Sequence, residues 1–298
     1  MKKIIMLFFI IFIASCTSKI EKEEGKVNVV VSFYPLEEFT KSIGGDKVSV
    51  TTLVSPGVEP HEWEPSPNDI VKLTKADILI YNGAGLESWI NKLFKIIDTK
   101  RTLIVEASKG IGLIRKSDDS NALTDPHVWL DPALAETEVQ NIVEGLSKVD
   151  PAGTEFYRFN ENNLIKRLKI LDAKFKSELS NCKKNEFVTS HDAFSYLAKR
   201  YGLLQTSVAG ISSEMEPTPK HIAELIDFIK QKNINTIFVE TMVNPKISEA
   251  LAKDTGSRIE ILNPFEGLTQ EQISAGENYF SVMEQNLNKL KIALDCKK

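Results

Sequence analysis

Short apolar runs alternate with amphipathic segments along most of this chain. The first example is a β-branched run at 27–33, followed by apolar residues at helical spacing over 36–43 and a stop at Gly44-Gly45. Further strands are expected at 47–54, 77–81, 102–106, 187–190, 205–209, 236–240 and 258–262, and further helices from Pro67, at 86–97, 133–146, 193–201, 219–232 and 245–255, with a last one ending near 294. Strands that alternate with helices predict parallel sheets, which bind ligands beyond the carboxyl ends of their strands.

One segment in the middle of the chain has a different character. Residues 151–181 carry apolar residues at helical spacing and no Gly or Pro after Gly153, which predicts a single helix extending roughly 45 Å. A mature chain of about 270 residues exceeds the usual single core. We therefore expect an α/β fold with two pseudo-symmetric lobes, each containing a parallel sheet, joined by one long rigid helix. The expected boundaries are 27–150 for the first lobe, 151–182 for the linking helix and 183–298 for the second lobe.

The N-terminus has the order of an export signal. Lys2 and Lys3 precede an apolar run at 4–13, which is shorter than the roughly 20 residues needed to span a bilayer. Small residues then precede Cys16, an order that resembles the cleavage site of exported lipoproteins. We expect a signal peptide at 1–15, a lipid on Cys16, a tether at 16–26 and an extracytoplasmic, membrane-anchored protein. The alternative is an ordinary signal peptide followed by an incidental cysteine.

Composition adds two constraints. The formal net charge of −4 gives no basic surface for nucleic acid. Cys182 and Cys296 form an even pair in what the signal indicates is an oxidising compartment, so a disulfide is plausible. Two thiols are the open alternative.

Three of the four histidines share one setting. His61 lies in the segment PHEWEPSP at 60–67, His127 lies in DPHVWLDP at 125–132, and His191 follows an expected strand and precedes a helix. Proline stiffens the backbone around the first two, and Asp131 before a proline predicts a helix N-cap. The spacings are too long for a local metal finger, so these histidines can meet only through the tertiary fold. Taken singly, each is more often a surface or capping residue; His221 lacks the setting and is expected to be solvated.

Convergence of three neutral imidazoles would suit Zn²⁺, in a cleft shared by both lobes. The carboxylates that could accept the second ring N–H groups are Asp125, Asp131, Asp192 and Glu59. Trp63 and Trp129 each lie two residues after a candidate ligand and could form a wall of the site or simply belong to the core.

These motifs, in their order, resemble the zinc- or manganese-binding lipoproteins that deliver metal to ABC importers. The resemblance rests on the two proline-flanked histidine segments, on HDAF at 191–194 before YGL at 201–203, on Glu216-Pro217 and on FVE at 238–240. It covers essentially all of residues 27–296. It implies two pseudo-symmetric lobes, a rigid linking helix and one metal in the cleft bound by His61, His127 and His191.

Two features depart from the family pattern. Many relatives place an Asp before proline as the fourth ligand, where this chain has Asn263 before Pro264. The fourth position is therefore expected to be Asn263, a water, Glu59 or Glu240. The segment 117–122 lacks the histidine-rich loop of many zinc scavengers. Because the third histidine is kept and no acidic fourth ligand is evident, zinc is favoured over manganese, iron or copper.

The leading hypothesis is a monomeric binding protein that captures Zn²⁺ outside the cell and delivers it to the membrane permease and ATPase of an ABC importer, without catalysing a reaction. Delivery of Mn²⁺ or Fe²⁺ by the same mechanism is the nearest alternative. A zinc metallohydrolase would need an open metal position and a general base, and the chain has no His-Glu-x-x-His helix to supply one. A surface adhesin with an incidental metal is the third hypothesis. Histidine ligands must be deprotonated, so binding is expected to weaken below about pH 6.

Overall fold

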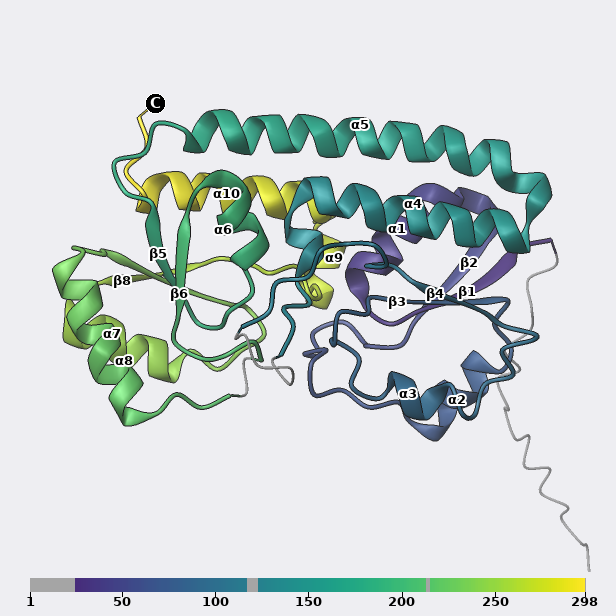
Figure 1. Cartoon of the computed structure of the whole chain (residues 1–298), viewed down its shortest axis with the longest axis horizontal. Helices are drawn as coiled ribbons and strands as arrows, with labels where there is room; N and C mark the ends of the chain where they lie inside the picture. Colours follow the sequence, from purple (N-terminus) through teal and green to yellow (C-terminus); the bar gives the residue numbers. More distant parts are fainter. Residues whose placement is uncertain (1–24, 117–122, 213–214, 298) are drawn as a thin grey trace, which may run out of the picture.

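Two parallel four-stranded sheets form the two lobes of the protein, seen in a computed structural model that describes residues 25–116, 123–212 and 215–297 (Figure 1). The first sheet has the order β2-β1-β3-β4, with strands Val48–Thr52, Val27–Val31, Ile78–Tyr81 and Leu103–Glu106. The second has the order β6-β5-β7-β8, with strands Leu204–Ser207, Glu186–Thr189, Thr236–Val239 and Arg258–Ile261. All neighbouring strands are parallel. The expected two-lobed α/β fold is confirmed.

Helices cover both faces of each sheet. The first sheet has α1 (Tyr34–Gly44) and α4 (Pro132–Val149) on one face and α2 (Pro67–Leu73) and α3 (Ile90–Leu93) on the other (Figure 1). The second has α6 (Ser195–Tyr201) and α10 (Tyr279–Ala293) on one face and α7 (Pro219–Gln231) and α8 (Lys246–Thr255) on the other. The short helix α9 (Gln270–Ser274) and the 3-10 turns η1 (Gly45–Lys47), η2 (Val128–Leu130) and η3 (Pro151–Gly153) complete the described elements.

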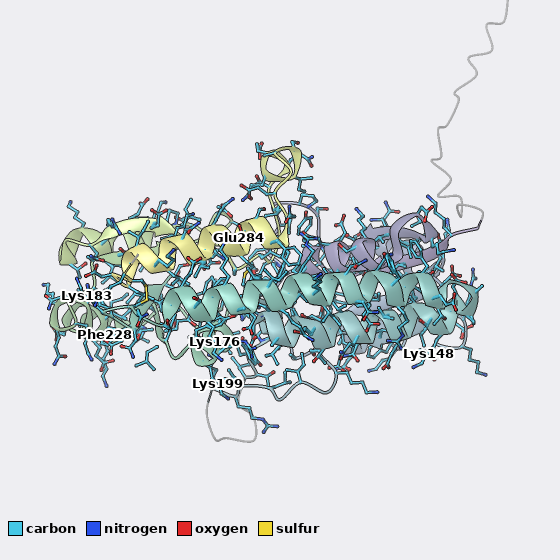
Figure 2. The ribbon with its side chains drawn as sticks, turned by 90° about the horizontal axis from the view of Figure 1, so that it is seen from above. Lys148, Lys176, Lys183, Lys199, Phe228 and Glu284 are labelled. Atoms are coloured by element: carbon cyan, nitrogen blue, oxygen red, sulfur yellow. A yellow bond between two sulfur atoms is a disulfide. The ribbon has the colours of Figure 1, made fainter. Side chains whose placement is uncertain are left out.

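The long helix is α5, Thr154–Leu179, whose 26 residues give a length of about 39 Å. It runs along the top of both lobes, between α4 and α10 (Figure 2). Its buried side chains join one hydrophobic core that contains residues of both lobes, whereas the opposite face of each sheet has a small separate core. The layer under α5 is thus continuous from one lobe to the other.

The last part of the chain returns to the first lobe after β8. The ring of Phe265 lies 5.4 Å from that of Tyr34. The backbone N–H of Tyr279 donates to the carboxylate of Glu38 at 2.8 and 2.9 Å, and the Tyr279 hydroxyl donates to the carbonyl of Trp129. The two lobes are therefore packed together by the segment that follows β8, and the boundaries 27–150, 151–182 and 183–298 stay predictions.

Two expected helices differ in extent. Of the segment 86–97 only α3 is α-helical, and most of the backbone bonds on both sides of it span three residues rather than four. The expected last helix is divided into α9 and α10 at Gly276, which has a φ of 78°. Asn278 then starts α10 anew by accepting the N–H groups of Phe280 and Ser281.

Cys182 and Cys296 are joined by a disulfide that ties the end of α5 to the end of the chain. Cys16 and the expected signal peptide lie outside the described residues. Within the described part of the chain, none of the helices has the length and apolar character needed to cross a membrane.

Glu87 and Glu138 are among the buried carboxyl groups of the first lobe. Glu87 accepts hydrogen bonds from the Ser32 hydroxyl and from the N–H groups of Asn82 and Gly83. Both carboxyl oxygens of Glu138 lack a hydrogen-bond partner among the described residues. Burial and the nearby charge of Glu87 raise the pKa of Glu138 from 4.5 to about 8.

Removal of the disulfide should destabilise the protein through the unfolded state. The disulfide closes a loop with a sequence separation of 114 residues, so the double variant C182S/C296S should lose about 3–5 kcal/mol of unfolding free energy. Urea denaturation of both proteins, with and without reductant, measures this loss. Reductant should lower the stability of the natural chain only; an equal effect on the double variant would contradict the assignment.

Replacement of Glu138 should reveal the cost of its buried charge. The folded pKa is raised above the unfolded value, so the folded carboxyl holds its proton to higher pH, and stability falls as pH rises from 4.5 to about 8. E138Q should match the natural chain near pH 4 and be more stable by about 4 kcal/mol at pH 8. Glu144→Gln, an exposed change on the same helix, is the control for denaturation across pH. A pH-independent gain for E138Q would contradict this prediction.

Candidate metal centre

Four side chains from both lobes converge at the carboxyl ends of the sheets. His61 lies in the loop after β2, His127 directly before η2, His191 just beyond β5, and Glu266 in the turn after β8. One ligand atom from each lies within 4.8 Å of the others. Crossover connections place the ends of parallel strands side by side, and so bring together residues that are far apart in the sequence.

Five of the six distances within this group are close to those of a tetrahedral metal site, and the sixth, between His61 and His191, is bounded by 4.8 Å. His127 Nε2 lies 3.1 Å from His61 Nε2 and 3.3 Å from His191 Nε2. Glu266 Oε1 lies 2.9 Å from His127 Nε2, 3.3 Å from His191 Nε2 and 3.4 Å from His61 Nε2. Four ligand atoms arranged tetrahedrally at the usual 2.0–2.1 Å from zinc are about 3.3 Å from one another. The four side chains therefore fit a single zinc ion.

Asn263 does not belong to this group. Its side-chain oxygen accepts the N–H of Phe265 at 2.8 Å, and its backbone is paired with the side chain of Asn286. Asn263 therefore stabilises a turn. The carboxylate near the imidazoles belongs to Glu266, three residues later. In the sequence Glu266 is one of many acids in loops, and only its place in the segment after the last strand distinguishes it.

The turn that presents Glu266 is fixed from several sides. Phe265 has a φ of 57°, a conformation that a bulky residue adopts only when its surroundings impose it. Its buried ring packs against Tyr34 and Tyr279, both at 5.4 Å. The indole N–H of Trp129 donates to the carbonyl of Pro264 at 2.8 Å. Contacts with the first lobe therefore position the carboxylate.

Comparison with known proteins gives the family. The family model described as "Zinc-uptake complex component A periplasmic", named ZnuA, matches residues 29–293. The high-affinity zinc uptake system protein ZnuA of Bacillus subtilis (strain 168) is 38% identical over 293 residues, which cover 94% of this chain and 92% of the relative. The chain belongs to the ZnuA family.

A streptococcal protein shows the same relationship in sequence and in structure. The zinc-binding lipoprotein AdcA of Streptococcus pneumoniae serotype 4 is 36% identical over 309 residues, which cover 99% of this chain and 62% of AdcA. The crystal structure of the Zn(II)-bound ZnuA-like domain of AdcA from this species superposes with a TM-score of 0.80 at 39% identity, covering 91% of this chain and 100% of that domain. The chain thus spans a little under two thirds of full-length AdcA and all of its ZnuA-like domain.

The ZnuA family model describes a zinc-uptake component, and the donor set of this site suits that metal. Imidazole nitrogens with one carboxylate oxygen suit zinc, whereas manganese favours more oxygen ligands. Of the four side chains only that of His61 has appreciable exposure, at 8%. Solvent therefore reaches the site past His61.

Carboxylates orient two of the imidazoles. Asp125 Oδ1 lies 2.8 Å from His127 Nδ1, and Glu240 Oε1 lies 2.5 Å from His191 Nδ1. Each contact directs Nε2 toward the centre of the group. Glu240, considered as a fourth ligand, supports His191 instead.

The remaining candidate carboxylates have other partners. Glu59 accepts the backbone N–H of His61 and has its carboxylate 4.0 Å from His61 Nε2. Asp131 caps α4 by accepting the N–H of Ala133. Asp192 pairs with Lys116 at 2.7 Å. Of the four acids expected to accept ring N–H groups, Asp125 alone is bonded to a ring nitrogen in the described part of the chain.

Burial and mutual contacts shift the pKa values in this group. Burial acts to lower the pKa of His127, but its bonds to Asp125 and Glu266 outweigh that effect and raise it. The pKa of His191 is likewise raised against burial, by the charges of Glu240 and Glu266. Burial acts to raise the pKa of Glu266, yet the imidazoles, His191 foremost, hold it well below its usual range. The pocket therefore keeps Glu266 ionised and attracts positive charge.

The tryptophans and the fourth histidine are also placed by the structure. Trp129 is fully buried with its ring 5.3 Å from that of His127, so it forms a wall of the site. Trp63 packs against Trp89 instead. His221 is half-buried, and its Nε2 lies 3.0 Å from the carbonyl of Ser207. His221 is therefore only partly solvated, because its ring contacts a carbonyl of β6.

The orienting carboxylates provide a test of the geometry. D125N and E240Q should each weaken zinc binding about 10- to 100-fold, because the amides no longer fix the imidazoles as a carboxylate does. D131N is the matched control, since Asn caps a helix as well as Asp does. Competition with a fluorescent zinc chelator measures the affinities. Equal losses in all three variants would mean that the orienting contacts do not determine affinity.

Proposed function

We propose that His61, His127, His191 and Glu266 hold one zinc ion as cargo. The observation that carries the proposal is that five of the six separations among their ligand atoms are 2.9–3.4 Å and that all four atoms lie within 4.8 Å of one another, which is close to the spacing of a tetrahedral zinc shell. Glu266, rather than Asn263, Glu59, Glu240 or a water, is the fourth ligand in this proposal. A carboxylate also supplies the negative charge that an amide or a water lacks.

A closed shell argues against catalysis. Catalytic zinc sites keep one position open for water or substrate, whereas here four protein side chains occupy the four positions. The protein in this proposal is not an enzyme. Product formation by a hydrolase reaction that requires His191 would overturn this part.

Delivery completes the proposed function. Membership of a zinc-uptake family supports transfer of the ion to the permease and ATPase of an ABC importer. We propose that the protein acts as a monomer outside the cytoplasmic membrane, attached by a lipid on Cys16 through the tether at 16–26. The charged, aperiodic sequence of this segment suits a tether between a lipid and a folded body.

Release in this proposal involves local movement rather than wide opening. The continuous core under α5 opposes a large hinge motion between the lobes, and the loop that carries His191 is the smallest unit whose displacement would break the shell. Weaker binding below about pH 6 stays a prediction.

Metal analysis of variants tests the proposal. Protein produced without residues 1–16 should contain about one zinc per chain, whereas His61→Ala, His127→Ala, His191→Ala and Glu266→Gln should each lose more than about 100-fold in affinity, beyond the 10- to 100-fold cost of losing an orienting partner. His221→Ala is the matched control, because this histidine lies outside the group. Elemental analysis after dialysis against a defined zinc buffer gives the stoichiometry. Full zinc occupancy in all the ligand variants would overturn the site.

A further inference from the structure

Lys116 connects the two lobes beside the metal centre. It lies in the segment between β4 and His127, and its ammonium reaches three acceptors. These are Ser195 Oγ at 2.6 Å, Asp192 Oδ2 at 2.7 Å and Asp125 Oδ2 at 3.3 Å. The contact with Ser195 is a hydrogen bond, and the contacts with the two carboxylates are ion pairs. Asp125 Oδ2 has no hydrogen-bond partner among the described residues, so the ammonium of Lys116 is the charge that faces it.

The partners of Lys116 stand next to metal-binding residues in both lobes. Asp192 directly follows His191, and Ser195 opens the helix that comes after it. Asp125 belongs to the other lobe and is fully buried, and its Oδ1 is occupied by the ring and the backbone N–H of His127. The Lys116 ammonium faces the second oxygen of this carboxylate. One cation therefore links the support of His127 to the residue beside His191.

A neighbouring tyrosine joins the same two segments. The buried hydroxyl of Tyr196 donates to the carbonyl of Asp125 at 2.8 Å and accepts the N–H of Ile114 at 3.0 Å. We refer to Ile114, Lys116, Asp125, Asp192, Ser195 and Tyr196 as the interlobe clamp. The clamp consists of protein groups alone, so it does not depend on zinc for its contacts.

The ammonium of Lys116 also helps to balance the negative charges of the buried carboxylates around the imidazoles. Asp125, Glu240 and Glu266 are three buried carboxylates around the imidazoles. A zinc dication and one ammonium together balance three carboxylates, and buried charge is tolerated only when it is paired.

We propose that Lys116 is a positioning residue that holds the His191 loop against the His127 loop and thereby slows the loss of zinc. The proposal rests on the proposed zinc site and adds a determinant of its release rate. Departure of His191 from the shell carries Asp192 away from His127, and this movement must break the bonds of Lys116 to Asp192 and Ser195. Lys116 and Asp192 have side chains exposed by 26% and 23%, so we expect a moderate effect, about tenfold in rate.

Zinc release rates of variants test the clamp. Stopped-flow mixing of zinc-loaded protein with excess chelator should give release about tenfold faster for Lys116→Met and for Asp192→Asn than for the natural chain. Because the two residues act through one contact, the double variant should be little faster than Lys116→Met. Lys232→Met is the matched control, since Lys232 pairs with Glu186 at 2.8 Å away from the centre, and it should release zinc at the natural rate. Natural release by Lys116→Met, or multiplied effects in the double variant, would overturn the proposal.

The salt dependence of the zinc release rate distinguishes loss of the ion pair from a general loss of packing. Added salt should speed release from the natural chain and have less effect on Lys116→Met, which has no ion pair to screen. An equal response to salt in both proteins would count against the clamp.

Hydrogen exchange keeps the proposal testable even if the proposed zinc site fails. In metal-free protein, the backbone amides of 190–196 should exchange faster in Lys116→Met than in the natural chain, whereas those of β1 should be unchanged. Unchanged exchange at 190–196 would overturn the clamp. Failure of the zinc site would appear separately, as zinc retained by the His61, His127 and His191 variants.

Discussion

A single buried carboxylate touches all three imidazoles of this protein, and the site depends on it. Glu266 Oε1 lies within 3.4 Å of the three Nε2 atoms, so one negative charge faces three groups that can each bind a cation. Such a carboxylate is stable inside a protein only with positive charge nearby. The pocket therefore holds protons or a metal ion, and its tetrahedral spacing selects for an ion that accepts four ligands.

The position of Glu266 explains the path of the chain after β8. The second lobe could be closed without returning to the first, yet the turn at 263–267 lies against Tyr34, Trp129 and Tyr279. These contacts impose a left-handed conformation on Phe265 and aim the next side chain at the histidines. The same segment then enters α10, which lies beside α5. The contacts that pack the lobes together therefore also place Glu266 beside the histidines.

The sheets separate the continuous core under α5 from the loops that carry the candidate ligands. Above them, one core under α5 runs through both lobes and resists hinge bending. At the carboxyl ends of the strands, the candidate ligands lie in loops that Lys116 and Tyr196 link across the lobes. A binding protein built this way can change its metal site locally while its overall shape is kept.

The sequence by itself determined the parallel α/β class, the long helix and the three histidines, because each has a local signal: hydrophobic period, absence of breakers, or proline-fixed backbone. It did not reveal Glu266, which is one of many acids in loops. Nor did it show that Asn263 holds a turn, that 86–97 is mostly non-helical, or that Lys116 pairs with Asp192. Those features depend on residues from segments far apart along the chain, and only the tertiary structure brings such partners within hydrogen-bond distance.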